Sequence, residues 1–377
     1  MRKKKIFLVI TPFFPSNNSF VGSYVFDQVN EIRNQTNFNI EVIKVVSAFS
    51  SEKDYEFKGF RVHIFKLFDI PFFIFPGIFN RLNKVRFKNF LNEKDIEKIQ
   101  YSHAHVSYPA AYLVEDLNCK KMVQHHGLDV LQLLNGRNNL IKKIQCNYLI
   151  RNTIKQLNKA DLNIGVSKLV LQKLSEFRTY NPKEEYVLYN GVDISKFYPK
   201  KIDENNIFTI GCVANFWEIK DQITLIKSVQ LLKEQGKEIL LRLIGTGPTL
   251  QMCKNFVSEN NLSKNIVFEK EIKHEELNLF FNEIDVFILP SYYEALGCVY
   301  MESWATNTPF IAVKGQGITE LIPSELKEKL VIGKSDVNQL IEKIDFLMKN
   351  PMILNFNQKY NIDNTISEFL KNKIFHD

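Results

Sequence analysis

Residues 287–309 read FILPSYYEALGCVYMESWATNTP, and this stretch decides how the rest of the chain is interpreted. An apolar run ends at Pro290, a polar turn carries Glu294, and a helical pattern that contains Glu302 begins near Gly297. This order predicts a strand, a loop and a helix. Spacing alone also fits an ordinary βα unit with two surface glutamates, so the remaining sequence has to distinguish the two interpretations.

A helix that begins at this point would offer a site for an anion. The backbone N–H groups of Leu296 to Val299 point out of its first turn, where aligned peptide dipoles favour an anion such as a diphosphate. Glu302 lies one turn deeper, where its carboxylate can accept hydrogen bonds from sugar hydroxyls. The pattern therefore favours a ligand that joins a diphosphate to a sugar.

Length and composition predict a soluble globular protein of two domains. The chain has 377 residues, of which 45% are hydrophobic and 24% charged. No apolar run approaches the roughly 18 residues of a membrane span. The run from Ile6 to Ile10 is too short for a signal peptide and is interpreted as a first buried strand. We therefore expect a cytoplasmic protein.

The net charge of +7 is unevenly distributed. Up to Ser195 there are 28 Lys and Arg against 18 Asp and Glu, and the remaining chain has 21 against 24. Any anionic surface should therefore meet the first half of the chain. No nucleic-acid recognition module is visible, so we expect no nucleic-acid partner.

Cysteines and histidines give no metal motif. The five cysteines form an odd and scattered set without a CxxC pair, which predicts reduced thiols: Cys119, Cys146, Cys212, Cys253 and Cys298. Four histidines lie near the ends of two expected strands: His103, His105, His125 and His126. They permit a metal hypothesis, but histidines near strand ends are more often hydrogen-bonded structural groups. We expect no metal.

Strands and helices alternate along the chain and then alternate again after a polar segment. This pattern predicts two Rossmann-like sheets of mainly parallel strands, with ligands beyond the carboxyl ends of the strands, in the cleft between the domains. The expected parts are a first domain at 1–199, a linker at 200–206, a second domain at 207–358 and a helix at 359–377 that packs back on the first domain.

The segment from Leu67 to Phe90 combines aromatic residues with bases. Ile78, Leu82 and Val85 share one helical face, together with Phe79. The helical part holds four basic residues and no acid: Arg81, Lys84, Arg86 and Lys88. Such a segment can lie on an anionic membrane surface, or it can cover a sheet with its lysines in water.

The motifs taken together resemble the retaining glycosyltransferases of GT-B fold, family 4. Glu294 and Glu302 are separated by the seven residues of that family's signature. Around them, GCVANFWEIKD resembles the phosphate-binding strand and loop, LIGTGP the turn after the next strand, GQGITELI a glycine-rich continuation, YNGVD the end of the first domain and QHHGLDV the histidine-glycine loop. The resemblance covers nearly the whole chain in order.

The resemblance implies a role for each matching residue. Glu302 would bind ribose hydroxyls, Glu294 the transferred sugar and Lys220 the diphosphate. His126 would face the reacting sugar, and Gly22 would belong to a loop that closes over the substrates. A lone glycine such as Gly22 is equally consistent with a simple turn. The remaining donor contacts would come from Gly245, Lys270 and Asn215.

Two of these positions depart from the family pattern. Asn215 stands where the family usually has an arginine, so one cation on the diphosphate is missing. Lys270 stands where a glycine is common in the loop that binds the base. The nucleobase assignment is correspondingly weaker, with a UDP-sugar favoured and a GDP-sugar as the alternative.

The implied function is transfer of a sugar to a glycan or polyprenyl-diphosphate-linked acceptor, in the assembly of capsule, O-antigen or another cell-surface polysaccharide at the inner membrane face. The sequence has no Asp-x-Asp pair at a strand end, so Lys220 and the helix N-terminus would replace a metal ion. A nucleotide-sugar epimerase and a non-catalytic partner subunit remain alternatives. A nicotinamide dehydrogenase is disfavoured because no GxGxxG follows the first strand.

Overall fold

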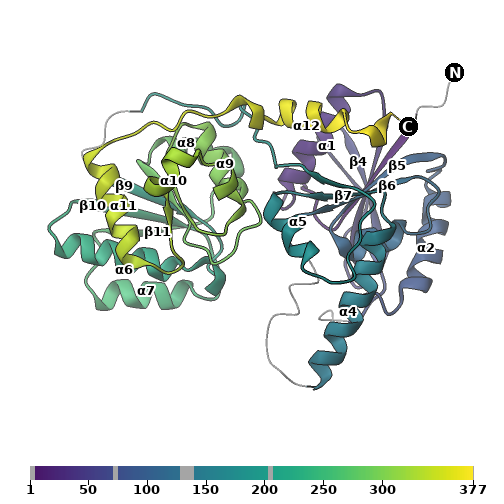
Figure 1. Cartoon of the computed structure of the whole chain (residues 1–377), viewed down its shortest axis with the longest axis horizontal. Helices are drawn as coiled ribbons and strands as arrows, with labels where there is room; N and C mark the ends of the chain where they lie inside the picture. The colour runs from purple at the N-terminus through teal and green to yellow at the C-terminus, as the bar shows by residue number, and fades with distance from the viewer. Residues whose placement is uncertain (1–4, 71–74, 128–139, 203–206, 377) are drawn as a thin grey trace. The chain divides into compact units, whose positions relative to one another are not determined.

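The computed structural model describes residues 5–70, 75–127, 140–202 and 207–376 (Figure 1). The chain divides into two compact units, of which one comprises Met1–Asn190 with Ile362–Asp377 and the other Gly191–Asn361. The sequence instead places the first boundary at 200–206 and the second at 359. Residues 203–206 of that expected linker lie outside the described residues.

The first unit is built on an eight-stranded sheet of order β3-β4-β2-β1-β5-β6-β7-β8. Its strands are β1 (Ile6–Thr11), β2 (Asn39–Ser47), β3 (Tyr55–Phe57), β4 (Phe60–Leu67), β5 (Ile99–His105), β6 (Lys120–His125), β7 (Leu162–Gly165) and β8 (Glu185–Val187). Only β3 and β4 pair antiparallel. Every residue of β1 is buried, as expected of a central parallel strand that is covered on both faces.

Helices cover this sheet. They are α1 (Ser23–Gln35), α2 (Asn80–Glu93), α3 (Tyr112–Val114), α4 (Leu140–Lys159), α5 (Lys168–Ser175) and α12 (Ile362–Leu370). Ser167 caps α5, because its side chain accepts a hydrogen bond from the Val170 N–H. No helix in the described part of the chain has the length and apolar content needed to span a membrane.

The last helix is part of the first unit's core. α12 contacts α1, and the side chain of Phe369, which belongs to α12, is fully buried. Its ring centroid lies 6.1 Å from that of His103, 5.6 Å from that of Tyr186 and 5.2 Å from that of Phe375. The predicted helix that returns to the first domain is therefore held there by apolar packing.

The second unit has a six-stranded parallel sheet of order β11-β10-β9-β12-β13-β14. Its strands are β9 (Phe208–Val213), β10 (Ile239–Ile244), β11 (Ile266–Glu269), β12 (Val286–Ile288), β13 (Phe310–Val313) and β14 (Val331–Ile332). Its helices are α6 (Gln222–Glu234), α7 (Leu250–Glu259), α8 (Leu277–Asn282), α9 (Cys298–Ala305), α10 (Ser324–Leu330) and α11 (Val337–Lys349). The strand order reverses between β9 and β12, and ligands of doubly wound sheets bind at such a point.

Replacing Phe369 by alanine should destabilise the first unit by about 3–5 kcal/mol, because it removes a fully buried aromatic ring and leaves a cavity. Urea unfolding followed by circular dichroism measures the change. Ile353→Ala is the matched control, since Ile353 is 73% exposed and its loss should cost less than about 0.5 kcal/mol. Equal effects of the two substitutions would contradict the assignment of α12 to the core.

Candidate functional site

The loops that follow β9 and β12 bring two predicted site residues together. Lys220 ends a short 3-10 turn after β9, and Glu294 lies in the loop before α9. Lys220 Nζ lies 2.5 Å from Glu294 Oε1, and both side chains are largely buried. Each of these groups therefore compensates the charge of the other.

Backbone hydrogen bonds hold the Glu294 loop in place. The Tyr292 N–H donates to the Ile219 carbonyl at 2.8 Å, which ties the loop to the one that carries Lys220. The Gly317 N–H donates to the Glu294 carbonyl at 2.9 Å. The position of the Glu294 carboxylate thus depends on three separate segments of the second unit.

Gln316 fixes the same loop through its side chain, and this role does not follow from the sequence motifs. Its side chain is buried; Nε2 donates to the Ser291 carbonyl at 2.8 Å, and Oε1 accepts from the Val313 N–H and the Tyr300 hydroxyl. The Tyr300 hydroxyl oxygen also lies 2.6 Å from the Leu289 carbonyl oxygen, so its single hydrogen is shared between the two acceptors. The glycines around Gln316 attract attention in the sequence, but nothing there shows that the residue between them is buried.

The strand, loop and helix predicted for residues 287–309 are all present. α9 begins at Cys298, and Gly297 before it has a φ of 83°. A side chain at this position would meet the ring of Tyr300 at 2.8 Å, so glycine is required. No side chain caps the helix at Gly297. The first turn is thus arranged to present backbone N–H groups, as an anion site requires.

Glu302 lies inside α9 and is 8% exposed. Its Oε1 lies 3.0 Å from Nε2 of His274, which belongs to the short turn before α8. Lys270, on the same connection, is exposed. The sequence analysis predicted Glu302 and Lys270 but not His274.

Gly245 and Asn215 lie close together after β10 and β9. A Cβ on Gly245 would come within 2.1 Å of the Ala214 carbonyl oxygen, so the glycine is explained by packing inside the unit. Asn215 is exposed, and its carbonyl accepts hydrogen bonds from Gln222 Nε2 at 3.1 Å and from the Trp217 N–H at 2.9 Å. Binding of a donor by these two residues stays a prediction.

The first unit gathers three histidines at the carboxyl ends of β5 and β6. The rings of His103 and His105 stack with centroids 4.3 Å apart, and His105 Nδ1 lies 3.0 Å from His126 Nε2. The Tyr24 ring lies 4.7 Å from that of His126. Residues 128–130 of the QHHGLDV loop region lie outside the described residues. His126 therefore belongs to a fixed stack, and its role toward a sugar stays a prediction.

Burial keeps the deepest histidines neutral. It lowers the pKa of His103 from 6.5 to about 3 and that of His105 well below 6.5, because the charged imidazolium loses its hydration. Among the residues described, no group of His, Cys, Asp and Glu has an arrangement that could hold a metal ion. These two histidines act in the core as neutral, stacked rings.

Gly22 precedes α1 with a φ of 90°. A Cβ there would lie 2.5 Å from the Phe13 carbonyl carbon, so the glycine permits close approach to the chain's own backbone. The simple-turn interpretation explains this residue without a ligand. Its contact with substrates stays a prediction.

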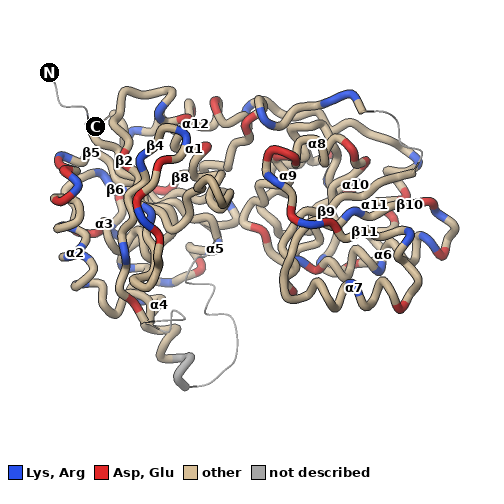
Figure 2. The backbone as a smooth tube through the Cα atoms, turned by 180° about the vertical axis from the view of Figure 1, so that it is seen from behind, with Lys and Arg blue, Asp and Glu red and all other residues tan. Residues whose placement is uncertain are grey.

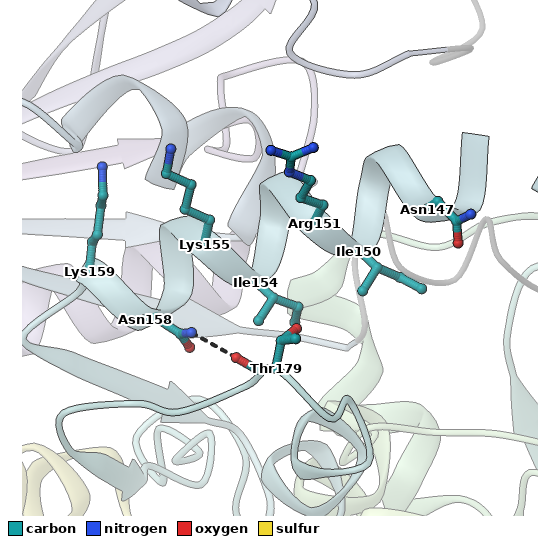
Figure 3. Close-up of a pocket in the computed structure, with 8 residues that line it drawn as sticks. All are labelled: Asn147, Ile150, Arg151, Ile154, Lys155, Asn158, Lys159 and Thr179. Carbon is teal, nitrogen blue, oxygen red and sulfur yellow. Dashed lines mark hydrogen bonds between the residues drawn. The ribbon is translucent and has the colours of Figure 1, made fainter. Parts of the chain in front are cut away.

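A groove lies between α4 and the loop after α5, and none of the predicted site residues lines it. It has a volume of about 440 Å³ and is lined by Asn147, Ile150, Arg151, Ile154, Lys155, Asn158, Lys159 and Thr179 (Figure 3). Asn158 donates to the Thr179 carbonyl at 2.8 Å, and the three basic side chains extend from the opposite side of the helix. Lys159 forms an ion pair with Glu115.

Helix α2 packs on the sheet through the face opposite to the predicted apolar stripe. Phe87 is buried and its ring centroid lies 5.1 Å from that of Phe65. Ile78, Leu82 and Val85 are 49%, 48% and 61% exposed. Ile78 and Phe79 precede the helix, and Leu82 and Val85 on α2 are turned away from the core.

The four basic residues of this segment differ in their surroundings. Arg81 and Lys88 are exposed, whereas Lys84 pairs with Glu115 and with Asp116. The Arg86 guanidinium lies 5.7 Å from the Phe65 ring centroid. Only two of the four basic residues are therefore directed mainly to solvent.

Elsewhere, basic and acidic residues are interspersed over both units (Figure 2).

Comparison with known proteins shows what the second unit is similar to. Residues 195–365 match the model of the glycosyl transferases group 1 family. EpsF of Bacillus subtilis, a glycosyltransferase by name, is 33% identical over 37% of this chain and 38% of its own length. The alpha-monoglucosyldiacylglycerol synthase of Streptococcus pneumoniae is 26% identical over 52% of this chain and 47% of its own length. Both alignments span less than half of the relative.

Other relatives are named for colanic acid, O-antigen and capsular polysaccharide biosynthesis. Among solved structures, Anabaena HepE in complex with UDP and glucose is similar with a TM-score of 0.71 and 15% identity, covering 98% of this chain and 100% of that chain. The resemblance to group 1 glycosyltransferases and the predicted GT-B fold class are confirmed.

The buried histidine should make the first unit less stable in mild acid. Below pH 6.5 His103 binds a proton in the unfolded chain but stays neutral in the folded one. The free energy of unfolding is therefore highest above pH 6.5 and decreases as the pH falls toward 3. Between pH 7 and pH 5, His103 alone should account for on the order of 2 kcal/mol. Urea unfolding of the wild type and of His103→Phe, which keeps an aromatic ring, tests this. An equally steep pH dependence in both would contradict it.

Proposed function

We propose that this chain is a retaining glycosyltransferase that moves a sugar from a nucleotide-diphosphate sugar to a glycan or lipid-linked glycan. The single observation that carries this proposal is the pairing of Lys220 with Glu294 at the point where the strand order reverses, beside the helix that contains Glu302. The match of this segment to group 1 glycosyltransferases supports it.

In the proposed complex, the diphosphate binds between Lys220 and the N-terminus of α9. The ammonium of Lys220 would then turn from Glu294 to the phosphate oxygens, and the Glu294 carboxylate would be released toward the hydroxyls of the sugar. Glu302 would accept hydrogen bonds from the ribose. A UDP-sugar is the preferred donor, in line with the complex of HepE with UDP and glucose.

Sugar transfer in this proposal needs no protein nucleophile and no metal ion. The acceptor hydroxyl attacks the anomeric carbon from the face that the nucleotide leaves, so the configuration is retained. As the bond to the phosphate oxygen breaks, that oxygen takes the proton of the acceptor hydroxyl. Lys220 and the first-turn N–H groups of α9 stabilise the negative charge that develops on the leaving diphosphate.

Asn215 favours one competing function, a GT-B partner subunit without catalytic activity. An arginine at this position would add a cation to the diphosphate, and the exposed Asn215 does not. Lys334 lies near the same loops, with its Nζ 4.0 Å from the Tyr292 ring centroid. A partner subunit would release no nucleotide with any acceptor, whereas an epimerase would change the nucleotide sugar without one.

Substitutions in the proposed donor site should abolish most activity. Glu294→Gln, Lys220→Ala and Glu302→Ala should each lower kcat/KM by about 10²–10³, because each removes a charge-assisted contact to the donor. The rate of nucleotide release from UDP- and GDP-sugars gives kcat/KM for each variant. Glu342→Gln and Lys349→Ala, on the exposed side of α11, should leave the rate unchanged. Wild-type rates in all three site variants would refute the assignments.

A lipid-linked acceptor would place the enzyme at the inner face of the membrane, and we propose that α2 contacts an anionic membrane surface there. The exposed stripe of Ile78, Leu82 and Val85 has no cover among the described residues, and Arg81 and Lys88 are exposed on the same helix. This combination fits an interfacial helix. Assembly of capsule or O-antigen is the process that such an acceptor would serve.

Removing the exposed charges of α2 should weaken binding to phosphatidylglycerol vesicles. Arg81→Ala with Lys88→Ala should cost about 1 kcal/mol per residue, or about thirtyfold in partitioning. Leu82→Asn with Val85→Asn should weaken binding to a similar extent. Lys371→Ala, a solvent-exposed control in the same unit, should have little effect. Unchanged co-sedimentation of both double variants would exclude α2 as the contact.

A further inference from the structure

The Glu302 carboxylate has only one of its two oxygens bonded inside the protein. Oε1 lies 3.0 Å from His274 Nε2, whereas Oε2 is buried and has no hydrogen-bond partner among the described residues. A buried acceptor without a partner is costly, and in a native protein such an atom usually has a catalytic role or a partner from outside the chain. The geometry therefore marks Oε2 as the oxygen that meets a ligand.

We propose that His274 is a positioning residue that fixes Glu302 so that Oε2 accepts a ribose hydroxyl, and that it thereby sets a preference for ribose over deoxyribose. This proposal rests on the proposed function, in which the donor carries a nucleoside diphosphate. It assigns to His274 a role in recognising the nucleotide without a contact to it.

The packing of His274 supports a fixed orientation. The Phe197 ring is buried and lies 5.2 Å from the imidazole, at an interplanar angle of 79°. The turn that carries His274 is closed by the Lys273 N–H, which donates to Glu276 Oε2 at 2.8 Å. Both the ring and its backbone are thus held by contacts independent of Glu302.

The direction of the hydrogen bond follows from the chemistry of the pair. An ionised carboxylate can only accept, so Nε2 of His274 must carry the hydrogen and donate it to Oε1. With Oε1 engaged, the carboxylate cannot rotate freely about its last bond, whose preferences are otherwise broad. Oε2 is then held in one place before the ligand arrives, which lowers the cost of ordering it on binding.

The test measures affinities for nucleotides that differ only at the ribose. Isothermal titration of UDP and 2′-deoxy-UDP, or of GDP and 2′-deoxy-GDP if guanine is the base that binds, gives a ribose preference for each variant. His274→Phe keeps an aromatic ring against Phe197 but has no donor, and it should lower this preference about tenfold. The affinity for the deoxy nucleotide should change little. His274→Asn, which retains an N–H donor, should recover part of the preference.

Three further measurements make the outcome decisive. Glu302→Gln should lose the preference as His274→Phe does, and Lys264→Ala, an exposed residue of the same unit, should keep it. Thermal unfolding shows whether each variant is folded. A wild-type preference in His274→Phe would overturn this inference alone. Equal affinity of the wild-type protein for the ribonucleotide and the deoxyribonucleotide would do the same. Binding of neither nucleotide diphosphate by the wild type would instead refute the proposed function.

Discussion

The contact between Lys220 and Glu294 depends on the strand order of the second sheet. Because β9 and β12 are neighbours at the point of reversal, the loops after them leave the same edge with no helix between them. Residues 74 positions apart are thereby brought to 2.5 Å. The pair is largely buried but lies at a loop surface, so its contribution to stability is modest. Its main effect is to hold two opposite charges at one place.

Much of the fold could be predicted from the sequence. The first strand, expected at Ile6 to Ile10, is present as β1 (Ile6–Thr11), because a short apolar run that ends before a turn predicts a buried strand. β3 was missed, since three residues are too few to show a pattern. The inward face of α2 was also missed. Asn83 sets that face by bonding both the N–H and the carbonyl of Phe68, a contact that periodicity does not reveal.

The site was predictable in its motifs but not in its contacts. The helix start at Cys298 and the depth of Glu302 follow from local spacing. The partners His274 and Gln316 do not, because they come from other loops and are selected by three-dimensional proximity. A histidine that follows several charged residues looks like a solvent-exposed side chain in the sequence. Only the folded chain shows that it lies against a carboxylate and a buried ring.

The core of the first unit is assembled from two separate parts of the chain. The second unit is continuous, whereas the first unit takes its last core residues, Ile366, Phe369 and Ile374, from the end of the chain. During synthesis the second unit can therefore form as soon as it has emerged, while the first, although it begins earlier, stays incomplete until α12 has also emerged. A truncated product would expose apolar surface that chaperones and proteases recognise. The first unit thus needs segments from both sides of the second unit to complete its core.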